Sequence, residues 1–105
     1  MSEARAVLDR AMSEDQLQDQ VTELADRMGW NWYHVHDSRR DRRGWPDLVL
    51  CRPPRLLIRE LKREGEQPTP EQAWWLEALR QCGIDVGVWR PSNWDEIVET
   101  LGASE

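Results

Sequence analysis

The chain has 105 residues, of which 39% are hydrophobic and 32% are charged, so we expect one small soluble domain over residues 13–105, preceded by an extension or short helix over residues 1–12. No apolar run approaches the roughly 20 residues that a membrane-spanning helix needs. The acidic N-terminus lacks the basic start and apolar middle of a secretory signal. These features exclude a membrane partner and favour an intracellular protein, in the cytoplasm of a bacterium or of a virus-infected cell.

The net charge of −6 conceals a strong separation of charge along the chain. Residues 39–63 contain nine Lys or Arg residues and three acids, so this segment carries +6 and the remainder carries −12. A basic segment in an acidic protein can form a local phosphate-binding surface while the rest stays soluble. A solvated loop without a partner is the alternative.

The N-terminal part of the chain predicts two helices. A short helix is compatible with Glu3 to Arg10, and a clearer one begins at Ser13, which forms a capping-box pattern with Gln16. Apolar residues then recur at helical spacing up to a terminating glycine: Leu17, Val21, Leu24, Met28 and Gly29.

Three strands are predicted in the middle of the chain. The aromatic, β-prone segment Trp30 to Val35 predicts the first, and a polar, arginine-rich loop follows it over residues 37–44. Two short apolar runs, Asp47 to Cys51 and Leu56 to Leu61, flank a proline-rich break, which is typical of an antiparallel hairpin.

The C-terminal part predicts a helix, a strand and a last helix. Thr69 and Gln72 form a second capping box, and this helix ends at Gly83. A strand over residues 84–89 and a helix over residues 93–101 follow. The whole order predicts an α/β fold, with a mixed sheet of about four strands flanked by helices.

The predicted hairpin gathers three charged side chains. If four residues form its loop, paired positions add up to 107, so that Asp47 faces Glu60 across the two strands. Lys62 lies two residues beyond Glu60 and therefore shares its face of the sheet. Two carboxylates roughly 5 Å apart repel each other unless a cation lies between them.

A divalent cation such as magnesium suits this pair, because it prefers oxygen ligands and keeps several waters. A metal-activated water oriented by Lys62 could attack a phosphodiester, and the lysine could stabilise the charge growing on the phosphate. The alternative is an ordinary cross-strand cluster in which Lys62 pairs with Glu60 on a solvated edge.

The helix beginning near Ser13 offers another acid. At 100° per residue, Glu14 points along the buried stripe at its N-terminal end, and Gln18 lies at the margin of the stripe. An inward carboxylate needs a partner, which the metal could supply. Alternatively, Glu14 only complements the helix dipole.

These motifs together resemble a known family. GWPDLVL (44–50) followed by RELK (59–62) resembles the Pro-Asp…(Asp/Glu)-x-Lys signature of the restriction-endonuclease-like superfamily. With SEDQLQDQV (13–21) before them and TPEQAWWL (69–76) after, the chain resembles a stand-alone VRR-NUC domain, the virus-type replication-repair nuclease, over about residues 13–101. Each short string is weak alone, whereas their order and spacing are specific.

The resemblance implies a restriction-endonuclease-like core and a DNA endonuclease that depends on Mg²⁺ or Mn²⁺. The implied catalytic residues are Asp47, Glu60, Lys62, Glu14 and Gln72. The implied metal ligands are Asp47, Glu60, Glu14 and the backbone carbonyl of Leu61. In related archaeal junction resolvases the helix acid occupies the position of Gln18, so Glu14 and Gln18 both stay open, and Gln72 could serve only as a capping residue.

The resemblance also implies partners. Stand-alone members resemble Holliday-junction resolvases and act as homodimers, which favours branched DNA such as four-way junctions, in replication, repair or recombination. A non-catalytic DNA-binding module and an accessory dimer subunit of a larger nuclease are the alternative functions. The expected DNA contacts are His36, Ser38, Arg39, Arg40, Arg42, Arg43, Gln18 and Arg63.

Trp74 and Trp75 are adjacent on the helix predicted after Thr69, so they cannot both face the same core. One of them is expected to be exposed and to pack against a second subunit. Stacking on DNA bases is the alternative use.

Overall fold

The structure is a computed structural model that describes residues 2–35 and 43–104. Its elements are α1 (Glu3–Ala11), α2 (Glu14–Arg27), β1 (Asn31–His34), β2 (Leu48–Arg52), β3 (Arg55–Leu61), α3 (Pro70–Gln81), β4 (Asp85–Trp89), the 3-10 turn η1 (Pro91–Asn93) and α4 (Trp94–Gly102). This is the predicted order of helices and strands, and the α/β fold is confirmed. No helix of the described part of the chain has the length and apolar character needed to cross a membrane.

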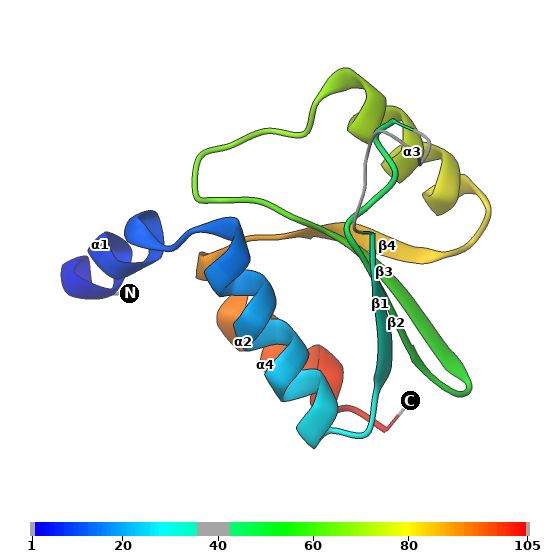
Figure 1. Cartoon of the computed structure of the whole chain (residues 1–105), viewed down its shortest axis with the longest axis horizontal. Coiled ribbons are helices and arrows are strands. Elements are labelled where there is room, and N and C mark those ends of the chain that lie inside the picture. The colour runs from blue at the N-terminus through cyan, green and yellow to red at the C-terminus, as the bar shows by residue number, and fades with distance from the viewer. Residues whose placement is uncertain (1, 36–42, 105) are drawn as a thin grey trace.

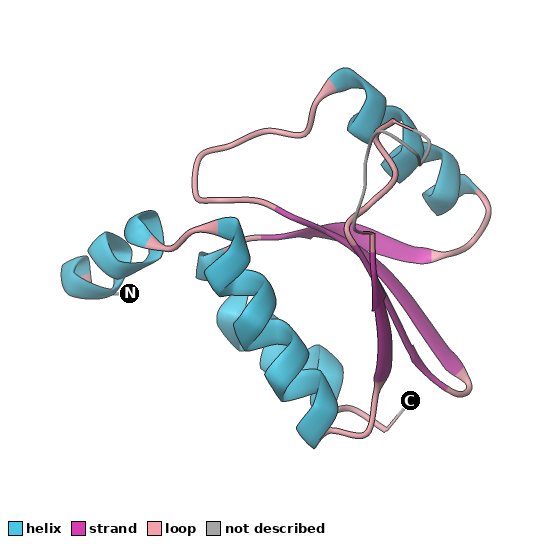
Figure 2. Cartoon of the chain, in the orientation of Figure 1, coloured by secondary structure: helices cyan, strands magenta, loops and turns pink. Residues whose placement is uncertain are grey.

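The four strands form one mixed sheet in the order β1-β2-β3-β4. The pairs β1–β2 and β2–β3 are antiparallel, whereas β3 and β4 are parallel. A parallel pair needs a crossover connection, and α3 supplies it. Figures 1 and 2 show α2 and α4 together on one side of the sheet and α3 on the other.

The core lies between the sheet and the helix pair α2 and α4. It consists of Leu17, Val21, Ala25, Trp30, Leu48, Leu50, Leu57, Leu61, Trp89, Ile97 and Leu101. The predicted apolar stripe of α2 therefore packs on one face of the sheet. Because side chains alternate along a strand, the intervening residues of β2 and β3 point to the α3 side.

The hairpin turn is tighter than predicted, but the register is the predicted one. Arg52 pairs with Arg55, so only Pro53 and Pro54 lie outside the ladder, rather than four residues. Extending the pairing by one step leaves all other partners unchanged, which is why the predicted register survives the wrong loop length.

Two arginines of the basic segment bind the C-terminal end of α4. Arg52 and Arg55 both donate hydrogen bonds to the backbone carbonyl of Ala103. Their guanidinium groups lie 4.7 and 5.0 Å from the ring centre of Trp30. Exposed carbonyls at a helix C-terminus attract cations, so these two charges stabilise the fold.

Arg59 is also used inside the protein. It is buried, its Nη2 lies 2.9 Å from Asp85 Oδ1, and its guanidinium carbon lies 4.7 Å from the ring centre of Trp89. The phosphate-binding charge expected of residues 39–63 therefore falls on fewer side chains than the sequence predicts.

Candidate active site

The open end of the β2–β3 hairpin brings the predicted acids together. Leu48 pairs with Arg59, so Asp47, just before β2, lies beside Glu60. Asp47 Oδ2 accepts a hydrogen bond of 2.9 Å from the backbone N–H of Leu61. This bond fixes the Asp47 carboxylate against β3.

Glu60 and Lys62 form a buried pair next to Asp47. Glu60 is only 1% exposed and Lys62 is 8% exposed, and Lys62 Nζ lies 3.5 Å from Glu60 Oε2. The other carboxylate oxygen, Glu60 Oε1, is buried without a hydrogen-bond partner among the described residues. Leaving such an atom unsatisfied is costly, so this oxygen is available to a cation.

The pKa of Glu60 is raised to about 8, first by burial and then by the charge and hydrogen bond of the neighbouring Asp47, against the opposing effect of Lys62. Two close carboxylates in a poorly solvated place favour keeping a proton. A divalent cation would displace that proton when it binds.

Glu14 belongs to the same group of charges. It is the first residue of α2, because the Ser13 side chain and Gln16 side chain close the predicted capping box. The pKa of Glu14 is raised, first by burial and then by a side-chain hydrogen bond with Glu66, while the Lys62 charge lowers it and the Asp47 charge raises it. The structure therefore places Glu14 close to the acids and the lysine.

Gln18, the other candidate on α2, is only partly buried. Its backbone carbonyl accepts a hydrogen bond of 2.9 Å from Thr22 Oγ1. Among the described residues, no hydrogen bond joins the Gln18 side chain to the acids. Which of Glu14 and Gln18 serves as the helix residue of the site stays a prediction.

Glu66 also belongs to this group of charges, through its hydrogen bond with Glu14. The sequence does not predict this residue as part of the site. Its loop is held in place, since Arg90 Nη2 donates to the Glu66 carbonyl at 2.6 Å and Glu64 Oε1 accepts from Ser92 N at 2.7 Å. These contacts bring the loop after β3 past the start of α2. No periodicity or spacing indicates them, because they are tertiary contacts.

The donor set fits a hard divalent cation held by few protein ligands. Within residues 2–35 and 43–104, no three His, Cys, Asp or Glu side chains are arranged to hold a metal ion together. Magnesium, however, commonly binds through one or two carboxylates and retains several waters. Asp47 and Glu60 supply such a pair, and the unsatisfied Glu60 Oε1 is consistent with it. The Leu61 carbonyl stays a predicted ligand.

The segment before Asp47 is anchored on α3. Gly44 has φ +88°, and a Cβ added there would lie 2.6 Å from the carbonyl carbon of Glu71. Trp75 Nε1 donates to the Arg43 carbonyl at 3.2 Å, and the Trp45 and Trp75 rings meet edge to face with centroids 4.9 Å apart. Helix α3 therefore positions the segment that leads into Asp47.

Gln72 completes the capping box of α3, which is the alternative to a catalytic role that the sequence predicts for this residue. Its Oε1 accepts a hydrogen bond of 2.8 Å from the backbone N–H of Thr69, and its own N–H donates to Thr69 Oγ1 at 3.2 Å. The side-chain oxygen is thus engaged in starting the helix, and a catalytic role of Gln72 stays a prediction.

Two of the predicted DNA contacts besides Gln18 lie within the described residues. Arg43 is exposed, and Arg63 is exposed with its Nη2 3.5 Å from the Arg10 carbonyl. The rest of that prediction falls outside the described residues: His36, Ser38, Arg39, Arg40 and Arg42.

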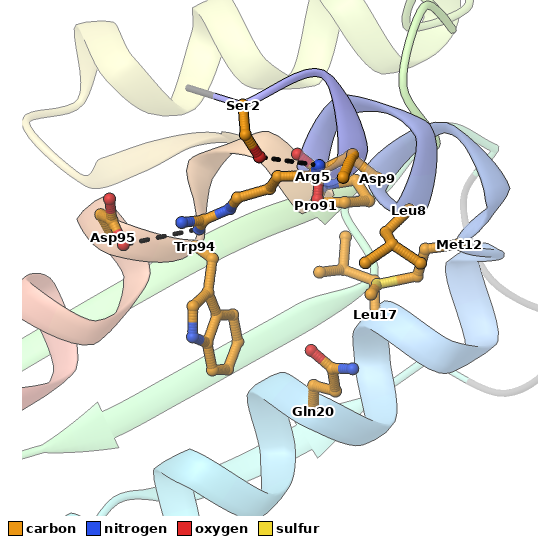
Figure 3. Close-up of a pocket in the computed structure, with 11 residues that line it drawn as sticks. Ser2, Arg5, Leu8, Asp9, Met12, Leu17, Gln20, Pro91, Trp94 and Asp95 are labelled. Atoms are coloured by element: carbon orange, nitrogen blue, oxygen red, sulfur yellow. Dashed lines mark hydrogen bonds and ion pairs between the residues drawn. The ribbon is translucent and has the colours of Figure 1, made fainter.

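A hollow of about 520 Å³ lies elsewhere, between α1, α2 and the start of α4 (Figure 3). Leu8, Met12 and Trp94 line it, and Arg5 pairs with Asp95 at 3.5 Å beside it. None of the acids or the lysine of the candidate site lines this hollow. The candidate site is instead at the end of a sheet.

Comparisons with known proteins agree with the resemblance seen in the sequence. A family model described as VRR-NUC domain matches residues 4–93. A solved structure titled "VRR_NUC domain" is 26% identical, and the match covers 85% of this chain and 97% of that chain with a TM-score of 0.72. No curated protein sequence matches this chain.

The raised pKa of Glu60 predicts a pH-dependent stability of the metal-free protein. A carboxyl group whose folded pKa lies above its ordinary value stabilises the fold at low pH, and this contribution is lost as the pH rises through the folded pKa. We expect the melting temperature in EDTA to be lower at pH 8.5 than at pH 5, by about 5 °C or more. Glu60→Gln should reduce this slope, whereas the exposed Glu23→Gln should keep it. A melting temperature that rises over this range would contradict the burial argument.

The contact of Gly44 with α3 predicts a large effect of a single methyl group. Gly44→Ala should lower the free energy of unfolding by about 2 kcal/mol or more, because strain at positive φ adds to a steric clash. Gly65→Ala is the matched control, since Gly65 has φ +84° with open space around it, and should cost only about 1 kcal/mol. Urea denaturation measures both, and equal losses would show that α3 does not hold this segment.

Proposed function

We propose that this chain is a Mg²⁺- or Mn²⁺-dependent endodeoxyribonuclease. The premise is that the chain belongs to the VRR-NUC domain family and is a nuclease-type domain. The observation that supports this most directly is the buried Glu60–Lys62 pair beside Asp47, with one Glu60 oxygen unsatisfied. A site that only bound DNA would gain nothing from this costly arrangement.

In this mechanism Asp47 and Glu60 would hold the metal ion, and Glu14 would act from the neighbouring helix without being a third side-chain ligand in the arrangement of the described residues. The ion would supply an activated water and polarise the phosphate. Lys62 is held by its contact with Glu60 and orients its ammonium group toward the phosphate, where it stabilises the negative charge that develops in the transition state. Its burial strengthens this interaction, because few waters compete for the charge.

The substrate we propose is branched DNA, such as a four-way junction, encountered in replication, repair or recombination inside a cell. The exposed Arg43 and the arginines that follow the first strand would contact phosphates on either side of the cut. A non-catalytic binding module and an accessory subunit are the competing functions, and the charged group at Glu60 favours the enzyme over both.

We further propose that two copies of the chain associate through the part of the α3 side of the sheet where Tyr33 of β1 and Leu56 of β3 are exposed, which we call the uncovered face. Tyr33 is 59% exposed and Leu56 is 42% exposed. Tyr33 pairs with Val49 and Leu56 pairs with Cys51, so their side chains share one face. A symmetric dimer would supply the two sites that paired cuts on a junction require.

The proposed chemistry predicts that two single substitutions in the site strongly slow cleavage. Glu60→Gln and Lys62→Ala should each lower the single-turnover rate on a four-way junction at least about 100-fold, and the wild type should be inactive without Mg²⁺ or Mn²⁺. The control Glu23→Gln changes an exposed acid of α2 and should keep the wild-type rate. Metal-independent cleavage, or a fully active Glu60→Gln, would overturn this proposal.

The proposed dimer predicts an effect of one charge on the uncovered face. Leu56→Glu should convert the dimer to a monomer, because a carboxylate would lose its hydration in the interface. The control Val98→Glu places the same charge on α4, where Val98 is 39% exposed, and should leave the dimer intact. Sedimentation equilibrium distinguishes the two states, and a monomeric wild type would contradict the proposal.

A further inference from the structure

We infer that the indole of Trp74 is a stacking platform for an unpaired nucleobase of the DNA substrate. This inference rests on the proposed nuclease function and adds a selectivity to it. Among branched substrates, the chain would prefer those with unpaired bases beside the cut, such as a flap, over a fully paired junction, and Trp74 would be the residue that recognises the unpaired bases.

Trp74 presents a large aromatic ring to solvent. Its side chain is 64% exposed, and it belongs to α3, none of whose residues is buried. Its ring meets the Trp75 ring edge to face, with centroids 5.2 Å apart and an angle of 89° between the planes. The ring is therefore held by one aromatic neighbour, and most of its surface is accessible to a ligand.

A series of contacts connects Trp74 to the segment just before Asp47. Trp75 contacts the Trp45 ring at 4.9 Å and donates to the Arg43 carbonyl. Trp45 is two residues before Asp47, so their Cα atoms are at most about 7 Å apart. The Trp74 ring is thus linked to the proposed metal ligand through two aromatic contacts and a short stretch of backbone.

An exposed aromatic ring near a positively charged side chain is suited to binding single-stranded nucleic acid. Proteins bind such strands through positive side chains that contact phosphates and aromatic rings that stack on bases. Arg43 is exposed at the base of this support. A base within a duplex is already stacked on both sides, so only an unpaired base offers Trp74 a free face.

The uncovered sheet face is the better place for a second copy of the chain. Tyr33 and Leu56 lie on the sheet itself, whereas Trp74 belongs to α3 and to the aromatic group that holds the segment before Asp47. If Trp74 instead contacted a second copy of the chain, Trp74→Ala would change the oligomeric state of the protein.

The test is a double-mutant cycle between Trp74 and individual bases. Binding is measured in metal-free buffer to a duplex with a single-stranded flap, and to the same flap with an abasic position at each of the first few unpaired nucleotides. We expect Trp74→Ala to weaken binding to the intact flap by about fivefold to a hundredfold. At one abasic position the same substitution should have no further effect, and Trp74→Phe should restore most of the affinity.

The controls separate stacking from other roles. Trp32→Ala removes another exposed tryptophan, on β1, and should leave the preference for the flap over a paired duplex unchanged. Equal losses on the flap and the paired duplex, or additive losses at every abasic position, would overturn the inference. So would a change of Trp74→Ala from dimer to monomer, which would assign Trp74 to a subunit contact.

Failure of this inference and failure of the proposed function give different results. Metal-dependent cleavage of the four-way junction and of the flap by the wild type is measured separately. Absence of cleavage on both substrates would overturn the nuclease proposal, whereas an additive binding cycle with intact cleavage would overturn only the role of Trp74.

Discussion

The constraint on which the site depends is the burial of the Glu60 carboxylate near the end of an inner strand of the sheet. Strand β3 lies between β2 and β4, and its side chains alternate between the helix-covered core and the α3 side. Leu57 and Leu61 fill the core, which forces Glu60 and Lys62 onto the opposite face. A one-residue slip would exchange the two sets, so the same register that buries the leucines also holds the acid and the lysine together. The stability of the core thus protects the geometry of the charged group.

The parts of the site that could be predicted from sequence are those fixed by local rules. The register of Asp47 and Glu60 follows from antiparallel pairing across a short turn. A two-residue turn and the predicted four-residue turn give the same partners along the strands, so the wrong turn length does not change this register. The position of Glu14 follows from the capping box that starts α2. The family resemblance adds chemistry to this geometry, and it is supported by the match over residues 4–93.

The parts that could not be predicted depend on contacts between distant segments. The loop that carries Glu66 is held by hydrogen bonds from Arg90 and Ser92, which are distant in the sequence. Arg59 looks like any other charge of a basic segment, yet it is buried against a ring and an acid. Counting charges along the chain therefore overstates the phosphate-binding surface, since sequence alone does not distinguish an arginine that neutralises carbonyls from one that faces solvent.

The two sides of the sheet have different physical tasks, and this division bears on how substrate choice is encoded. The side with α2 and α4 contains the buried apolar core, whereas none of the residues of α3 is buried, and this helix contacts β4 and the segment with Gly44 and Trp45. Exposed residues of α3 can therefore vary with little cost to the core, because their substitution opens no cavity. The acids and Lys62 have no such freedom, since the register of β3 fixes them. In the function we propose, the sheet sets the chemistry, and α3 with the segment that leads into Asp47 sets the selectivity for DNA structure.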